Sequence, residues 1–159
     1  MTIAVRLLEP QDLSQLHSFW RQRWGDDFIV VHGACYRPED VNGFVAVEAG
    51  RWIGLITYVL RQAECEIVSL DSLREGLGLG SSLIEKVVAE ARQAGCKRVF
   101  LISTNDNLEA LGFYQRRGFE LVKVNRAAVQ HGRQLKPAIP LIGMHGIPLR
   151  DEIEMERRL

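Results

Sequence analysis

The sequence lacks the features that mark several specialised classes of protein. Lys plus Arg and Asp plus Glu each number 20, so the formal net charge is zero. Nothing therefore suggests bulk attraction to nucleic acid or to an anionic membrane. No apolar run approaches the roughly 20 residues that cross a bilayer, and the first residues lack the basic-then-apolar layout of a signal peptide. We expect a cytoplasmic protein that binds neither nucleic acid nor membrane.

Cysteine is scarce, and its spacing does not indicate a disulfide framework. The three cysteines, Cys35, Cys65 and Cys96, are odd in number and far apart, and no pair has the spacing of a metal or redox site. The sequence predicts three buried thiols in a reducing compartment, and no metal. With 159 residues, 47 % of them hydrophobic, the chain is long enough to form one domain with a proper core over residues 1–159.

The order of apolar patterns predicts an α/β fold. Short apolar or alternating runs indicate strands at residues 3–8, 44–48, 52–59, 64–70, 99–103, 119–124 and 151–156. Helical spacing indicates helices at residues 10–20, 81–92, 107–117 and 127–135, and residues 21–40 are expected to be irregular. Because hairpin strands come first and strand–helix alternation follows, we expect a mixed central sheet.

The most informative stretch is the turn at residues 75–80, Glu-Gly-Leu-Gly-Leu-Gly, between a predicted strand and a predicted helix. Alternating glycines allow a ligand to approach the backbone closely, and the first helical turn offers N–H groups and partial positive charge to an anion such as pyrophosphate. The turn lacks the Gly-Lys-Ser/Thr ending of a P-loop. It also lacks the two-residue gap before the third glycine of a dinucleotide-binding turn.

A second motif lies in the run Asn-Leu-Glu-Ala-Leu-Gly-Phe-Tyr-Gln-Arg-Arg-Gly-Phe, residues 107–119. The two motifs together, in this order and separation, resemble those of the GNAT superfamily of acetyl-CoA-dependent N-acetyltransferases. In the first motif Glu75, Gly78 and Gly80 occupy the family's positions. In the second the matching residues are Asn107, Ala110, Tyr114, Gly118 and Phe119. The resemblance covers roughly residues 3–125, and the tail, residues 137–159, is less typical although it ends in a predicted strand.

The resemblance implies a single-domain GNAT fold, with helices on both faces of the mixed sheet, and acetyl-CoA as cosubstrate. Backbone groups of the strand before the turn would bind pantetheine, and N–H groups of the turn would bind the pyrophosphate. Glu75 departs from the family's Arg or Gln, so either Arg74 supplies the cation or Glu75 faces solvent while the N–H groups bind. The residues implied in cofactor binding are Ser69, Leu70, Arg74, Glu75, Gly76, Leu77, Gly78, Leu79, Gly80, Ser81, Asn107 and Tyr114.

The same resemblance implies direct attack of an amine on the acetyl thioester, with a carboxylate as base. Glu66 matches the base of several relatives, and Glu64 lies two residues earlier on the same strand face. The alternative interpretation of both is a solvated strand carboxylate. Tyr114 matches the general acid that protonates the departing thiolate, or is a core tyrosine. Asn107 is an N-cap, a cofactor ligand, or both.

The acceptor is expected to be a primary amine of a small molecule or a peptide. The weaker candidates for contacting it are Trp24, Asp26, His32 and Tyr36, all in the segment where relatives build the acceptor pocket. A homodimer is a further expectation that no particular residue supports. The alternative function is a non-catalytic acyl-CoA sensor or interaction module on the same fold, and fold resemblance alone does not name the acceptor.

Overall fold

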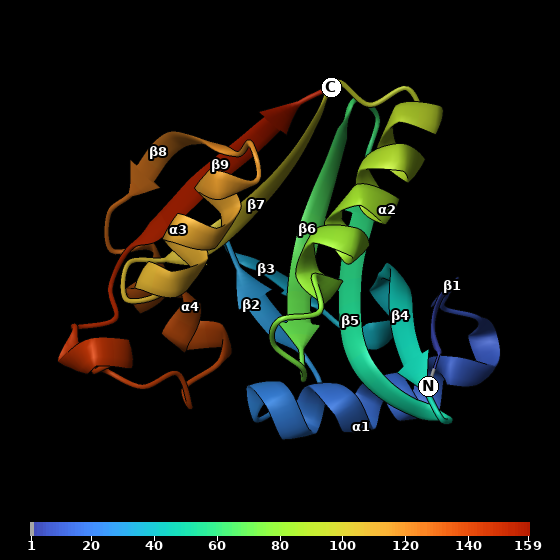
Figure 1. Ribbon diagram of the computed structural model, residues 1–159. Helices are drawn as coiled ribbons and strands as arrows, with labels where there is room; N and C mark the ends of the chain where they lie inside the picture. Colours follow the sequence, from blue (N-terminus) through green and yellow to red (C-terminus); the bar gives the residue numbers. More distant parts are fainter. Residues whose placement is uncertain (1) are drawn as a thin grey trace. The chain divides into compact units, whose positions relative to one another are not determined.

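The computed structural model describes residues 2–159, which form two compact units (Figure 1). The first unit contains the chain up to Ile29, then Tyr36–Val99 and Leu159. The second contains Val30–Cys35 and Phe100–Arg158.

Four strands of the first unit form an antiparallel array in the order β1-β4-β5-β6. Their bounds are β1 (Ile3–Leu7), β4 (Asn42–Glu48), β5 (Arg51–Leu60) and β6 (Glu64–Ser72). Two helices complete the unit, α1 (Leu13–Trp24) and α2 (Leu79–Gln93), with short 3-10 turns at Pro10–Asp12 and Pro38–Asp40. The β4–β5 hairpin turns at an Ala-Gly pair with positive φ at both residues, which matches the right-handed twist of its strands.

The two helices contact opposite faces of these strands, and a bulge in β5 sorts its residues between the two faces. The register with β4 shifts so that Ile53 is an extra residue on β5. Gly54 consequently faces α2, where a Cβ added to it would lie 3.3 Å from the Leu83 side chain. Trp52 faces the other way, and its ring lies 5.9 Å from that of Phe19 on α1. Each apolar helix stripe thus buries itself on its own face of the sheet.

The second unit contains β8, β9 and β7 from Phe100 onward, in the order β7-β9-β8. Their bounds are β7 (Arg98–Thr104), β8 (Glu120–Asn125) and β9 (Glu152–Arg158). Its helices are α3 (Leu108–Arg116) and α4 (Ala128–Leu135), with a 3-10 turn at Met144–Gly146. β8 and β9 run antiparallel.

A buried carboxylate anchors the long connection between α4 and β9. Asp106 accepts hydrogen bonds from the Thr104 hydroxyl at 2.6 Å and from the backbone N–H of Met144 at 2.9 Å. The carboxylate lies so close to the Cα of Gly143 that any Cβ there would collide with it. Arg133 also donates to the backbone carbonyls of Ile139, Pro140 and Leu149, so Asp106 is one of several side chains that hold the backbone of this connection.

The strands and helices expected from the sequence are confirmed, with ends that differ by a few residues. Two expectations are wrong. The segment 21–40 is not irregular throughout, because α1 continues to Trp24 and a small hairpin follows, formed by β2 (Ile29–Val31) and β3 (Ala34–Tyr36). Cys35 is exposed rather than buried, because it lies on a short hairpin strand whose next residue, Tyr36, points inward instead.

Candidate active site

A bulge in β6 brings three polar side chains onto one face. The register with β5 shifts so that Val68 is an extra residue on β6. As a result Glu66, Ser69 and Asp71 all face the same side, although simple alternation would separate Glu66 from the other two. Their partners are alternate residues of one strand, Val59, Thr57 and Leu55. Bulges commonly re-aim side chains beside active sites.

Glu66 is the most buried carboxylate on this face, with 1 % of its surface exposed. The hydroxyl of Tyr36 donates to its Oε1 at 2.5 Å, and Arg61 donates to the same oxygen at 2.9 Å. Arg61 also donates to the Tyr36 oxygen at 2.5 Å, which closes a ring of three groups. Burial, together with the hydrogen bond to Glu66, raises the pKa of Tyr36 to about 12, so this phenol remains a donor at neutral pH.

Glu64 has a different environment on the same strand. Its side chain is 43 % exposed and accepts a hydrogen bond from Arg98 at 2.9 Å. Of the two glutamates singled out in the sequence, only Glu66 is buried beside Tyr36.

Asp71 ends this row of side chains next to the glycine turn. It is buried, and it accepts a hydrogen bond from the indole N–H of Trp24 at 3.1 Å. Arg23 lies 3.4 Å away. Burial raises the pKa of Asp71 above its ordinary value, while the contacts with Trp24 and Arg23 oppose that effect. Trp24, expected to contact the acceptor, thus joins the end of α1 to the end of β6.

The glycine turn has the geometry of an anion-binding cradle. Gly76 and Gly78 have φ of 78° and 68°, values that favour glycine, and a Cβ at either would point into open space. Gly78 is the N-cap of α2 and, as a glycine, has no side chain to cap that helix end. The first N–H groups of α2 therefore open toward the surface above the turn, where they fit a pyrophosphate. Leu77 is exposed and Leu79 is buried in the core.

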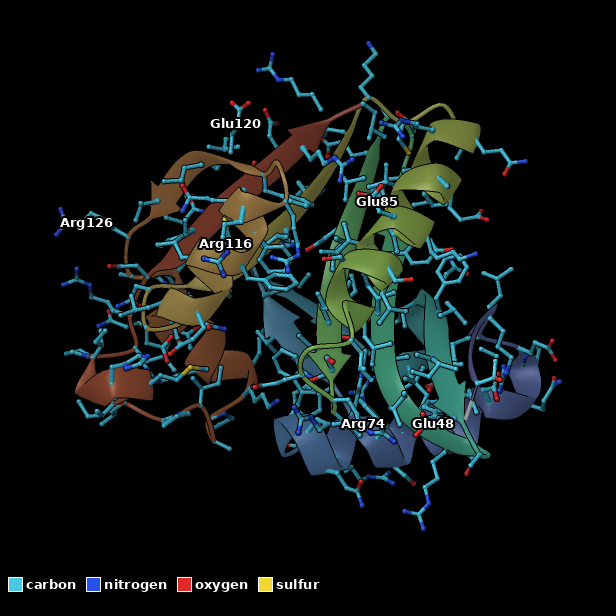
Figure 2. The ribbon with its side chains drawn as sticks, in the orientation of Figure 1. Glu48, Arg74, Glu85, Arg116, Glu120 and Arg126 are labelled. Carbon is cyan, nitrogen blue, oxygen red and sulfur yellow. The ribbon has the colours of Figure 1, made fainter. Side chains whose placement is uncertain are left out.

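The two charged residues before the turn do not converge on it. The guanidinium of Arg74 pairs with the carboxylate of Glu48 at the end of β4, as the labelled side chains show (Figure 2). Glu75 is exposed to solvent. With Arg74 paired to Glu48 and Glu75 in solvent, the interpretation in which main-chain N–H groups bind the pyrophosphate stays a prediction.

The second unit contains the other conspicuous motif. The Asn107 side chain accepts a hydrogen bond from the N–H of Ala110 at 3.1 Å and so caps α3. Tyr114 is buried on the inner side of α3. Its ring packs edge-on against Phe113 and Phe119, with centroids 5.2 and 5.4 Å away. The N-cap role of Asn107 is confirmed, and packing fixes the position of the Tyr114 phenol.

The remaining sequence candidates each have contacts of their own. His32 has positive φ, and its backbone N–H donates to both carboxylate oxygens of Glu152 at 3.1 Å. Asp26 is half-buried in the loop after α1. The hydroxyl of Ser69 is 2.6 Å from that of Thr57. Within residues 2–159, no group of three His, Cys, Asp or Glu side chains is arranged to hold a metal ion, and no helix is long and apolar enough to span a membrane.

Sequence reasoning missed Arg61, Asp71 and the bulge at Val68. Arg61 lies in the turn between two predicted strands, where a charged residue is ordinary. If the two strands are paired as a hairpin, Arg61 comes close to Glu66. That pairing is the one signal in the sequence that could have identified Arg61. A bulge depends on how two strands register, and nothing in a single strand's pattern reveals it.

Comparison with known proteins agrees with this geometry. Residues 8–119 match the model of the acetyltransferase (GNAT) family. The chain is 42 % identical over 139 residues to the uncharacterized protein YdhI of Bacillus subtilis (strain 168), covering 87 % of each. It is 38 % identical over 160 residues to YxbD of the same organism, covering 100 % of this chain and 99 % of YxbD.

A solved structure shares the fold. A GNAT family acetyltransferase from Elizabethkingia anophelis with acetyl-CoA bound has a TM-score of 0.72 at 17 % identity, over 99 % of this chain and 98 % of that one. The α/β fold with a mixed central sheet, expected from the sequence, is confirmed. The chain belongs to the acetyltransferase (GNAT) family.

Proposed function

We propose that this chain transfers the acetyl group of acetyl-CoA to a primary amine of a small molecule or peptide. The observation that carries the proposal is the Tyr36–Glu66–Arg61 cluster on the bulged face of β6, the same strand that leads into the glycine turn. Family membership supports acetyl transfer, and acetyl-CoA is bound in a structural neighbour. We further propose that residues 1–159 work as a single catalytic domain.

Acetyl-CoA would supply an activated acyl group that an amine attacks directly. The reaction forms a C–N bond and breaks the C–S bond, and the ammonium must first lose a proton. Glu66 is the proposed proton acceptor, with Tyr36 and Arg61 fixing its orientation. Glu66 is favoured as the base over Glu64 because it is buried. The carboxylate of Glu64 is instead partly exposed to solvent and paired with Arg98.

The leaving thiolate needs a proton, and Tyr114 is its proposed donor. The buried, edge-packed ring would hold the hydroxyl in one place, and a phenol has a pKa close to that of an aliphatic thiol. The N–H groups of residues 77–81 are proposed to bind the pyrophosphate. Ser69 and Leu70 would contribute backbone groups to the pantetheine arm, in the manner of an added strand.

The acceptor pocket is proposed to lie where Tyr36 borders Glu66. Trp24, Asp26 and His32 stay weaker proposals for acceptor contacts. A cytoplasmic setting is also proposed, because all three cysteine thiols are free.

The test has two stages. Thermal melting with acetyl-CoA, NAD and ATP should show stabilisation by acetyl-CoA alone. Thiol release with a panel of small and peptide amines should then show turnover with at least one class. Stabilisation without turnover would favour the alternative, a non-catalytic acyl-CoA sensor, and stabilisation by NAD or ATP instead would overturn the proposal.

A further inference from the structure

A pocket lies in the first unit between the start of α1 and two 3-10 turns. The turns are Pro10–Asp12, directly before α1, and Pro38–Asp40, just before β4. The pocket has a volume of about 350 Å³, near the lower end of the range for small-molecule sites. Tyr36, Arg61 and Glu66 are not among its lining residues, so it is separate from the cluster proposed for acetyl transfer.

The two turns give the pocket a rigid rim. Each begins with a proline, whose fixed φ suits that position. Each ends in an aspartate, Asp12 or Asp40, whose side chain accepts a hydrogen bond at 2.8 Å from the backbone N–H just before the proline. His17 on α1 contacts the Glu39 carboxylate at 2.5 Å and so holds the second turn against the helix.

The lining of the pocket combines an apolar wall with acidic groups. The apolar part of the wall comes from Leu8, Pro10, Leu13, Leu16, Pro38 and Val41. The other lining residues are Glu9, Asp12, Glu39 and Asn42. Three carboxylates therefore border an apolar surface that includes no lysine or arginine among these lining residues.

Neighbouring cations balance these carboxylates only in part. Arg6 donates two hydrogen bonds to Asp12, at 2.7 and 3.0 Å. Glu39 is 50 % exposed and contacts His17 through Oε1, and within residues 2–159 its Oε2 has no partner. The carboxylate of Glu9 contacts only a neutral amide among the side chains, that of Gln11. Three negative charges thus face one arginine and one histidine, which leaves a net negative charge whether or not the histidine is protonated.

We propose that this pocket binds a small organic ammonium ion. Its hydrocarbon body would lie against the apolar wall, where burial supplies affinity, and its nitrogen would donate to Oε2 of Glu39. The side-chain oxygen of Asn42 is a second acceptor among the lining residues. The uncompensated charge selects the sign of the ligand, because an anion would be repelled and a neutral molecule would lose the ionic contact.

The test is a titration of the full chain without acetyl-CoA, followed by the backbone amide signals in NMR at pH 7. The probe is hexylammonium, and 1-hexanol and hexanoate are its neutral and anionic analogues with the same chain length. Hexylammonium should shift the amides of residues 8–16 and 38–42 to a plateau. Hexanol should bind about fivefold more weakly, the value of one partly exposed ionic contact, and hexanoate should produce no such shifts.

Two variants separate the charge from the apolar wall. Glu39→Gln should weaken hexylammonium binding about fivefold and leave hexanol binding unchanged, because it removes the charge and keeps the shape. Leu13→Trp should abolish the binding of both, because the larger ring fills the pocket from an exposed position. Glu120→Gln and Leu121→Trp make the same substitutions at exposed residues of β8 and are the matched controls, which should bind like wild type.

Shifts that rise linearly with concentration, or that are equal for the three probes, would overturn the proposal, since they indicate non-specific adsorption. Binding that Leu13→Trp leaves intact would also overturn it. The outcome is independent of the proposed acetyl transfer. A chain that transfers acetyl groups without these shifts would contradict this inference alone, and a chain that shows them without transfer would contradict only the proposed function.

Discussion

The Tyr36 hydroxyl donates to Glu66 Oε1 at 2.5 Å, and the two residues come from different strands, 30 positions apart in the sequence. Tyr36 ends the small hairpin that follows α1, whereas Glu66 begins the bulged region of β6. This hydrogen bond therefore connects two parts of the proposed site. Tyr36 belongs to the segment proposed to contact the acceptor, and Glu66 is the proposed base.

Glu66→Gln should lower kcat about 100-fold, the usual contribution of a positioned base. Glu64→Gln is the matched control on the same strand and should stay within about twofold of wild type, because its carboxylate is half in solvent. Steady-state kinetics with the amine identified in the acceptor screen would measure both. Equal losses in the two variants would remove Glu66 from its proposed role.

Tyr114→Phe should lower kcat while acetyl-CoA affinity stays nearly the same. The substitution keeps the ring packed against Phe113 and Phe119 and removes only the hydroxyl. A loss of about 100-fold or more is expected for a proton donor. Calorimetric titration with acetyl-CoA would report the binding side, and an unchanged kcat would mean that Tyr114 is a packing residue.

Gly78→Val should weaken acetyl-CoA binding about tenfold or more, because a side chain would fill the open space above the turn. Gly78→Asn distinguishes blocking of the space above the turn from backbone strain. Asn tolerates the positive φ of this position but still carries a side chain. It should keep the fold and lose affinity.

Gly95→Asn is the matched control for the glycine turn. Gly95 also has positive φ, 80°, and open space around it, but it follows the opposite end of α2. The Gly95→Asn variant should bind acetyl-CoA with the same affinity as wild type. If Gly78→Asn binds as well as Gly95→Asn, the turn is not where the phosphates bind.

Asp71→Asn should stabilise the protein at neutral pH. Burial raises the folded-state pKa of Asp71 above its ordinary value of 3.8, so the folded protein binds the proton more tightly than the unfolded chain. The resulting penalty is absent below the unfolded-state pKa and complete above the folded-state pKa. The gain in unfolding free energy should therefore appear at pH 7 and vanish near pH 3, measured by urea unfolding.

Asp12→Asn should show the opposite sign. The hydrogen bond from Arg6 lowers the pKa of Asp12, so this carboxylate stabilises the fold above its ordinary pKa and loses that effect as the pH falls. Asp12 also accepts a hydrogen bond from the backbone N–H of Glu9 at 2.8 Å. The variant should be about 1 kcal/mol less stable at pH 7, typical of a partly exposed ion pair that also caps a backbone N–H. Its curve should converge on wild type in acid, and a parallel curve would contradict the assignment.

Trp20→Phe should cost far less stability than Trp20→Ala. Trp20 is fully buried, and within residues 2–159 its indole N–H is the only buried side-chain polar atom without a hydrogen-bond partner. Alanine would leave a large cavity and cost about 3–5 kcal/mol. Phenylalanine would leave a smaller gap and also remove an unsatisfied donor, which alone is worth about 1–3 kcal/mol. Urea unfolding followed by circular dichroism would measure both.

Much of the fold was predictable because its signals are local. The alternating strands, the helical stripe after the glycine turn and Asn107 as a cap each depend on residues near one another in the sequence. The family motifs are equally local. The short hairpin ending at Tyr36 is not predictable in this way, because strands of three residues are too short to show the alternation of apolar and polar residues.

The candidate site was predictable only in part, for a physical reason. Glu66 could be singled out from its position, but its partners Tyr36 and Arg61 are chosen by tertiary packing. The placement of Glu66 beside Ser69 depends on Val68 being an extra residue, which only the pairing of β5 with β6 decides. Arg74 appeared suited to an anion, yet the end of β4 offers it Glu48.

The contact between Asp106 and Gly143 has a consequence for engineering. A loop graft from a relative into residues 137–150 has to keep glycine at position 143, because that position admits no Cβ while the aspartate remains. A donor loop without glycine at position 143 would also require a smaller residue in place of Asp106. That replacement would remove the hydrogen bond from the backbone N–H of Met144.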